Sequence, residues 1–596
     1  MKRWLSIFLA ALILFGAVGC TNTSSGGDET TLPPETDAPV QKTLVLAEGV
    51  GTDYVVLRAE NGSDADVAQA IRLRKAIAET VGVDLAMGTD WVRSAADIPA
   101  AAHEIVVGHT NRPQTVSALE NDLLSRDWGI YFTDGRVTIV GGDDAATEAA
   151  VDYFVENLLD AEGKKLELEE GFAYIRRHVY PLGEITLNGV PLKEYTVVIP
   201  ASPNVFEENA AHALCDYLLA QGGFTLPVIR DSEPRAEHEL IIGGTSRPES
   251  KKYDGQEYGE MEYLLTAEGN HAVLRGEGYL VGGAVGALAA LIRPEKAGDA
   301  TAAQLSTAGK PEKFIFADKA KNMILLIGDG MGYNQIELAL ANGMEFFIPR
   351  FFPNQGEAKT YSASHAITDS AASGTALSSG YKTNNRYLGM NPRGEKMPNI
   401  REVAHDAGAQ TAVITTDALT GATPAAFTAH VKDRDMSNEI KAQQAAIEIE
   451  YLAGKVGNGI VDETRAALRT IANGDSDSFF IMVEEAYIDK HAHSNAGDDV
   501  VRTVKLLNDI AAYLSQFVFL HPDTALIVTA DHECGGIMKK ADGTFYFTSD
   551  NHTGVNVPVS AVGAGTDFFG GKTVENVEIA RFMGRAWGVE KMGAQG

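Results

Sequence analysis

The second half of the chain contains short apolar runs that end in polar side chains. The runs lie at 323–327, 367–370, 423–424, 479–483 and 525–530. Short, unbroken apolar runs are typical of strands buried on both faces, as in a parallel sheet covered by helices. Because ligands gather at the carboxyl ends of such strands, we expect the polar groups that end the runs to share one cleft.

The first half of the chain repeats itself. The segment 103–108 (HEIVVG) recurs as 238–243 (HELIIG), and each copy is followed by Arg-Pro, at 112–113 and 247–248. This self-similarity predicts two copies of one small α/β module. We interpret the repeated Arg-Pro as a turn that ends a strand rather than as a ligand site.

The pattern predicts three folded parts. We place module copy 1 at 43–180, module copy 2 at 181–312, and a doubly wound, mainly parallel α/β domain at 313–596. All candidate ligands lie in the last part. We therefore expect that domain to retain its chemistry when the modules are removed, because contacts between domains are usually modest in area.

The N-terminus has the features of an export signal. Residues 1–20 combine two early basic side chains with a short apolar stretch that ends at Cys20, and the sequence AVGC resembles a bacterial lipobox. We expect removal of this segment, a lipid on Cys20 that anchors the protein to the membrane, and a flexible polar linker at 21–42. The expected location is extracytoplasmic, membrane-anchored or secreted.

Composition excludes some classes of partner. The formal net charge of −31 argues against binding to nucleic acid or to an anionic membrane surface. Of the three cysteines, only Cys215 and Cys534 follow the signal segment, so a disulfide framework does not stabilise the fold. Cys534 stands two residues after His532, and we expect it to be a packing residue rather than a metal ligand.

Several side chains suit metal binding and phosphoryl transfer. Asp489 and His493 are spaced i, i+4, which places them on one face of a helix. Asp531 and His532 follow a predicted buried strand. Ser370 begins a helix rich in small residues and is the candidate nucleophile, although a role in capping that helix is an equally simple explanation.

Five motifs, taken in order, resemble those of the alkaline phosphatase family. They are IGDGMG at 327–332, TDSA at 368–371, ATPAA at 422–426, VE at 483–484 with IDKHAH at 488–493, and TADH at 529–532. The resemblance covers about 316–590. It implies a metal-dependent phosphomonoesterase that acts on small phosphomonoesters through a phosphoserine intermediate, with an alkaline-phosphatase-like sheet.

The resemblance also implies a set of site residues. Ser370 is the nucleophile and Arg434 binds the phosphate. Two zinc ions and one magnesium ion are held by three ligand sets. The first zinc has Asp489, His493 and His552, the second zinc has Asp329, Asp531 and His532, and the magnesium has Asp329, Thr423 and Glu484. Imidazole with carboxylate suits zinc, and an all-oxygen set suits magnesium.

Some alternatives stay open. Gly421 stands where the family usually carries Asp or His, which leaves the third metal undecided; an added carboxylate at Gly421 should strengthen magnesium binding. A phosphodiesterase of the same superfamily is the first alternative. The second is a surface glycan-binding lipoprotein with a vestigial phosphatase half. A sulfatase is disfavoured, because Pro and Arg do not surround Ser370. Formation of a homodimer is undecided.

Overall fold

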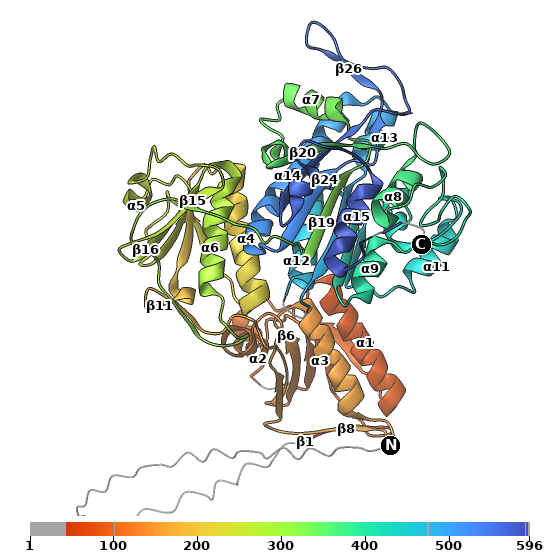
Figure 1. The fold of residues 1–596 in the computed structure, drawn as a ribbon. Coiled ribbons are helices and arrows are strands. Elements are labelled where there is room, and N and C mark those ends of the chain that lie inside the picture. The colour runs from red at the N-terminus through yellow and green to blue at the C-terminus, as the bar shows by residue number, and fades with distance from the viewer. Residues whose placement is uncertain (1–42, 101, 474–475, 591, 594–596) are drawn as a thin grey trace, which may run out of the picture.

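The computed structural model describes residues 43–100, 102–473, 476–590 and 592–593 (Figure 1). The expected signal segment at 1–20 and the linker at 21–42 lie outside these residues. Within the described ranges, none of the helices combines the length and the apolar character that crossing a membrane requires.

The C-terminal part is built on an eight-stranded sheet. Its central strands β23, β19 and β24 are fully buried and parallel, which confirms the strands predicted at 479–483, 323–327 and 525–530. The strand order is β22 (Tyr451–Gly454), β21 (Gln410–Thr415), β23 (Phe479–Glu485), β19 (Asn322–Gly328), β24 (Thr524–Thr529), β29 (Val557–Gly563), β20 (Asn354–Lys359) and β30 (Thr573–Glu575). Only β29 pairs antiparallel with its neighbours, so the sheet is mainly parallel, as predicted.

Helices cover both faces of this sheet (Figure 1). One group consists of α12 (Ile460–Ile471) and α14 (Gly497–Leu520), and the other includes α8 (Ser370–Ser379), α9 (Ile400–Asp406), α10 (Ala422–Thr428) and α15 (Val577–Gly584). The arrangement confirms the α/β class. Two of the five predicted strands were wrong, because 367–370 leads directly into α8 and 423–424 lies inside α10. Both runs are too short and too rich in polar residues to form a buried strand.

The N-terminal half contains two sheets with equivalent strand order. In each, the first four strands are parallel, and the fifth pairs antiparallel with both of its neighbours. The first is β3 (Ala86–Thr89), β2 (Val55–Arg58), β4 (Glu104–Val107), β6 (Arg136–Gly141), β5 (Trp128–Thr133) and β9 (Ala173–Arg176). The second is β13 (Val228–Arg230), β12 (Thr196–Ile199), β14 (Glu239–Ile242), β16 (His271–Gly276), β15 (Glu262–Glu268) and β18 (Glu312–Lys313). The boundaries at 43–180 and 181–312 stay predictions.

The repeated Arg-Pro forms part of a buried ion pair in each sheet. Glu104 accepts from Arg112 at 2.9 Å and 3.0 Å, and Glu239 accepts from Arg247 at 3.1 Å. All four side chains are buried. The proline then begins a short helix, α2 (Pro113–Ser117) or α5 (Pro248–Lys251). These arginines are therefore occupied by an internal carboxylate.

The second sheet is joined closely to the C-terminal part. Its helices α4 (Val205–Gly222) and α6 (Val281–Ile292) pack against α14 (Figure 1). A Cβ atom at Gly286 would lie 2.3 Å from the Phe519 carbonyl oxygen, so only glycine permits this approach. Buried apolar side chains from 182–305 and 314–592 form one continuous core, whereas those of 44–168 form another.

A network of charges connects the same two parts. Asp216 on α4 accepts from Arg465 at 2.8 Å, from Arg469 at 2.9 Å and from the buried Tyr513 hydroxyl at 3.0 Å. The expectation that the domain at 313–596 separates easily rested on a modest interface. The shared core instead indicates that separating residues 313–596 from residues 181–312 would expose the apolar face of α14.

Candidate metal centre

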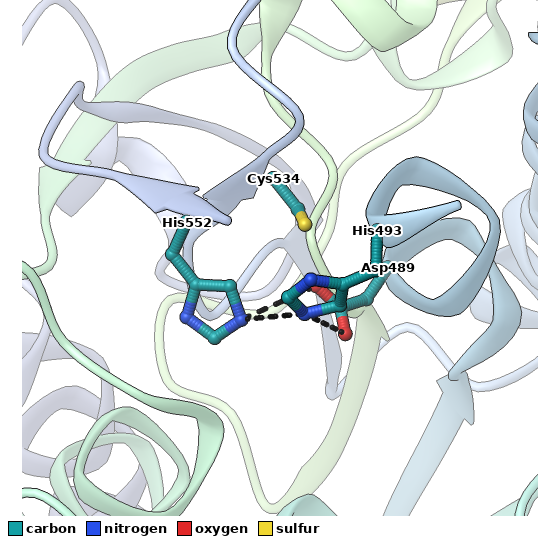
Figure 2. A group of neighbouring side chains, drawn as sticks. All are labelled: Asp489, His493, Cys534 and His552. Atoms are coloured by element: carbon teal, nitrogen blue, oxygen red, sulfur yellow. Dashed lines mark hydrogen bonds and ion pairs between the residues drawn. The ribbon is translucent and has the colours of Figure 1, made fainter. Parts of the chain in front are cut away.

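The first predicted ligand set converges in space (Figure 2). Asp489 and His493 lie one turn apart on α13 (Tyr487–His493), and His552 lies on β28 (His552–Thr553). His493 Nε2 is 3.3 Å from Asp489 Oδ2, and His552 Nε2 is 3.5 Å from Asp489 Oδ1. The two Nε2 atoms are 3.2 Å apart.

The outer ring nitrogens fix the orientation of both imidazoles. His493 Nδ1 lies 2.5 Å from the carbonyl oxygen of Asp550, and His552 Nδ1 lies 3.0 Å from that of Thr368. A carbonyl oxygen can only accept, so each Nδ1 carries the proton. Each Nε2 lone pair is then directed at the other ligands, which is the usual arrangement of metal-binding histidines.

The second set lies at the carboxyl ends of neighbouring strands. Asp329 follows β19, and Asp531 and His532 follow β24, which is parallel to β19. His532 Nε2 is 3.4 Å from Asp329 Oδ1 and 3.2 Å from Asp531 Oδ2. The ring of His532 stacks on that of His552 with centroids 3.6 Å apart, so the two sets adjoin.

The candidate nucleophile lies beside the second set. Ser370 is the first residue of α8, and its Oγ is 3.1 Å from His532 Nε2. Asp369 caps the helix by accepting from the backbone N–H of Ala372 at 2.9 Å. The capping role therefore belongs to Asp369, and the side chain of Ser370 is free to face the metal sets.

Glu484 and Thr423, the residues expected at the third site, are both buried. Glu484 is at the end of β23, where it pairs in register with Ile327 of β19. Thr415 Oγ1 donates to Glu484 Oε2 at 2.5 Å. The neighbouring Glu485 points to the other face of the strand and accepts from the N–H of Tyr487 at 2.9 Å.

The pKa values of the clustered side chains indicate a site for cations. Burial, with repulsion from Asp531 and Asp489, raises the pKa of Asp329 well above its usual range. Burial raises the pKa of Glu484 to about 8 and that of Asp531 to about 6. A hydrogen bond with Asp489 raises the pKa of His493 to about 9. Without metal ions, these groups bind protons, which balance the buried negative charge. Bound metal ions would balance the same charge.

Unpartnered atoms support the same conclusion. Among the described residues, several buried donor or acceptor atoms of these sets have no hydrogen-bond partner. They are Asp329 Oδ1, Asp489 Oδ1, Asp531 Oδ2, Thr423 Oγ1 and His532 Nδ1. Buried polar groups are normally satisfied. Four of the five are oxygen atoms that accept or ligate, so the donor set fits divalent metal ions.

Arg434 lies beside the cluster. Its Nη1 is 3.4 Å from Asp369 Oδ2, and the side chain is about one-third exposed. Asp369 also accepts from the backbone N–H of Arg386 at 3.0 Å, and the Arg386 guanidinium binds Asp433. A partly exposed guanidinium that keeps free N–H groups can bind a phosphate at the mouth of the site.

Two further residues lie close to the ligand sets, and only the second of them, Cys534, was singled out from the sequence. Asp417 lies 2.5 Å from Lys490 Nζ, and a Cβ atom at Gly421 would lie 2.8 Å from Asp417 Oδ2. The Asp417 carboxylate thus lies beside Gly421, and its charge contributes to the raised pKa of Glu484. Cys534 packs in the buried core, as expected, and its Sγ also lies within 4.8 Å of ligand atoms of Asp489, His493 and His552.

Known proteins match the part of the chain that carries these sets. The profile of the family "Alkaline phosphatase" matches residues 320–455 and 457–548. This range includes all of the predicted site residues except His552.

Two curated relatives and one solved structure illustrate the likeness. Alkaline phosphatase 3 of Bacillus subtilis (strain 168) is 27% identical over 338 residues, which cover 45% of this chain and 71% of that protein. The alkaline phosphatase of Escherichia coli (strain K12) is 42% identical over 125 residues, 19% of this chain and 26% of that protein. The structure of the alkaline phosphatase from the Antarctic bacterium TAB5 is 25% identical and covers 45% of this chain and 99% of that chain, with a TM-score of 0.43.

Three observations indicate the same kind of site. The ligand sets lie at strand ends, their acidic and imidazole side chains are buried, and the family profile matches this part of the chain. Residues 320–548 therefore match the alkaline phosphatase family of metal-dependent phosphoester hydrolases.

Proposed function

We propose that this chain hydrolyses phosphate monoesters through a covalent phosphoserine at Ser370. The observation that carries the proposal is the position of Ser370 Oγ, which is buried and 3.1 Å from His532 Nε2 at the edge of the second ligand set. A serine needs activation to act as a nucleophile, and a metal ion held by the adjacent ligands would supply it.

The proposed metals are two zinc ions and one magnesium ion. Zinc would be held by Asp489, His493 and His552 and by Asp329, Asp531 and His532, and magnesium by Asp329, Thr423 and Glu484. When bound, such ions stabilise the negative charge of the attacking and leaving oxygens. The mixed nitrogen and oxygen donors of the first two sets, and the oxygen donors of the third, support this division.

Two protein groups would carry the rest of the reaction, with Ser370 as the nucleophile and Arg434 as the phosphate-binding group. Ser370 Oγ would form a bond to phosphorus while the bond from phosphorus to the ester oxygen breaks. Water would then cleave the phosphoserine and release inorganic phosphate. Ser370 begins α8, where backbone N–H groups favour phosphoryl oxygens. Arg434 would bind two of those oxygens with its planar guanidinium.

Comparison of three p-nitrophenyl esters tests this function in the full chain supplied with zinc and magnesium. The phosphomonoester should react fastest, and the rate should rise into the alkaline range, because Ser370 and the buried ligands must lose protons. Faster turnover of the phosphodiester would favour the phosphodiesterase alternative, and faster turnover of the sulfate would favour a sulfatase. No turnover of any ester would favour a glycan-binding lipoprotein.

A pair of serine variants tests the covalent step. Ser370→Ala should remove most turnover while zinc stays bound, because the three protein ligands of each zinc set remain. Ser378→Ala is the matched control, since Ser378 is buried in the same helix and donates to the carbonyl oxygen of Ala426 at 2.8 Å. A Ser370→Ala variant with the parent's rate would contradict the phosphoserine mechanism.

The cellular location is a separate part of the proposal. The basic and apolar start of the chain and its AVGC sequence support an extracytoplasmic protein with a lipid on Cys20. Replacement of Cys20 by Ser should release the activity from the membrane fraction of a bacterial host, and activity that stays with the membrane would contradict the lipid anchor.

A further inference from the structure

The first ligand set has a fourth potential ligand, the thiol of Cys534. Figure 2 shows the sulfur facing the same space as Asp489, His493 and His552. One ligand atom from each of the four residues lies within 4.8 Å of the others. Cys534 is fully buried, so its side chain is enclosed among these groups rather than exposed to solvent.

Strand pairing explains how Cys534 reaches this position. It lies on β25 (Glu533–Cys534), which pairs antiparallel with β28, and its direct partner is His552. Side chains of directly paired residues lie on the same face of a two-stranded sheet, with their Cβ atoms about 5 Å apart. The pairing therefore places the sulfur beside the imidazole of His552.

The backbone of Cys534 is held on both sides. Its N–H donates to the carbonyl oxygen of Gly330 at 3.1 Å, and its carbonyl oxygen accepts from Gln335 Nε2 at 2.5 Å. Gly330 has a left-handed φ of 74°, and a Cβ atom there would lie 2.8 Å from the Asp489 Cα. Glycine at 330 thus lets the loop after β19, to which the Cys534 N–H is hydrogen-bonded, approach the helix that carries Asp489.

We propose that the Cys534 thiolate is a fourth protein ligand of the metal ion bound by Asp489, His493 and His552. This inference rests on the proposed function for the presence of that ion. One sulfur, one oxygen and two nitrogen donors complete the tetrahedral set that zinc prefers. Two negative ligands also balance the charge of a divalent ion inside a buried site.

A cysteine ligand changes the properties of this site. A thiolate favours thiophilic ions such as zinc over magnesium or manganese. Four protein ligands fill a tetrahedral site, so an ester oxygen would bind this ion as a fifth ligand, an expansion that catalytic zinc can undergo. The second set, which adjoins Ser370, lacks such a ligand among the described residues. The two sites should therefore differ in metal retention, with the Cys534 site the tighter.

The competing explanation is that the neutral thiol only donates a hydrogen bond to Asp489 and never contacts the metal. Spectroscopy separates the two, because a thiolate bound to cobalt(II) gives a near-ultraviolet charge-transfer band and a thiol nearby does not. The test protein is the full chain with Cys20→Ser and Cys215→Ser, which leaves Cys534 as its single cysteine.

Cobalt(II) binding to this single-cysteine protein should produce the charge-transfer band. X-ray absorption of the zinc form should show a sulfur neighbour at about 2.3 Å. The further change Cys534→Ser should remove both signals and weaken zinc binding at this site by about 100-fold or more, since loss of an outer-shell partner alone costs about 10- to 100-fold. Cys534→Ala is a second variant, and circular dichroism verifies the fold of each.

The outcomes are distinct. A band in the single-cysteine protein supports the proposal even if both Cys534 variants fail to fold. Bound cobalt without a band, together with phosphatase activity, would overturn the inference about Cys534 and leave the proposed function intact. A protein that binds no divalent metal at all would overturn both.

Discussion

Glu484→Gln should stabilise the metal-free protein and inactivate the metal-loaded enzyme. Glu484 is buried at the end of β23, and burial raises its pKa to about 8 from an ordinary value of 4.5. The unfolded chain loses this proton at lower pH than the folded one. The metal-free fold should therefore lose stability as the pH rises from 4.5 to 8.

The size of the effect follows from the shift. Each pKa unit corresponds to about 1.4 kcal/mol, so the carboxylate should cost the metal-free fold about 5 kcal/mol above pH 8. Glutamine has nearly the same shape and stays neutral, and its amide oxygen can still accept from Thr415. We expect Glu484→Gln to be more stable than the parent by about 3–5 kcal/mol at pH 9 and nearly equal to it at pH 5.

Urea unfolding in the presence of a chelator, followed by circular dichroism at pH 5 and pH 9, measures this difference. Glu485→Gln is the matched control, since burial raises the pKa of Glu485 to about 7 but its side chain lies on the other face of β23. Both variants should gain stability at pH 9, and only Glu484→Gln should lose activation by magnesium. A Glu484→Gln variant no more stable than the parent at pH 9 would refute the reasoning.

Three further changes test the surroundings. Gly421→Asp should lower stability and magnesium affinity, because its Cβ would lie 2.8 Å from the Asp417 carboxylate; stronger magnesium binding in a titration would support the sequence-based expectation instead. Asp216→Asn should cost about 1.5–3 kcal/mol in urea unfolding with kcat unchanged, since it removes the charge that faces Arg469 while Arg465 keeps Asp462 at 3.5 Å, whereas Tyr513→Phe should cost about 1 kcal/mol; equal losses would contradict the network. Zinc must displace the proton from His493, whose pKa is about 9, so zinc affinity at this site should rise about 10-fold per pH unit from about pH 7 to 9, and about 100-fold per unit where the Cys534 thiol also loses its proton to the metal; a flat profile would contradict this.

The sequence by itself determined the features that depend on local spacing. The apolar runs at 323–327, 479–483 and 525–530 had to become buried parallel strands, because neither face of these strands carries the polar side chains that a solvent-exposed face requires. Asp489 and His493 share a helix face by their spacing alone. Motif order then indicated the family, although the short runs at 367–370 and 423–424 carried too little periodicity to separate helix from strand.

Only the tertiary structure decided what depends on the approach of distant segments. The register of β25 with β28 brings Cys534 opposite His552, and no local pattern encodes that pairing. Asp417 comes to lie beside Gly421 and Lys490 because the loop after β21 folds back toward α13. The packing of α6 on α14 through Gly286 merges two parts that the repeat had suggested were separate. In each case the stabilising energy comes from a contact between residues far apart in the chain, and that contact exists only after the chain has folded.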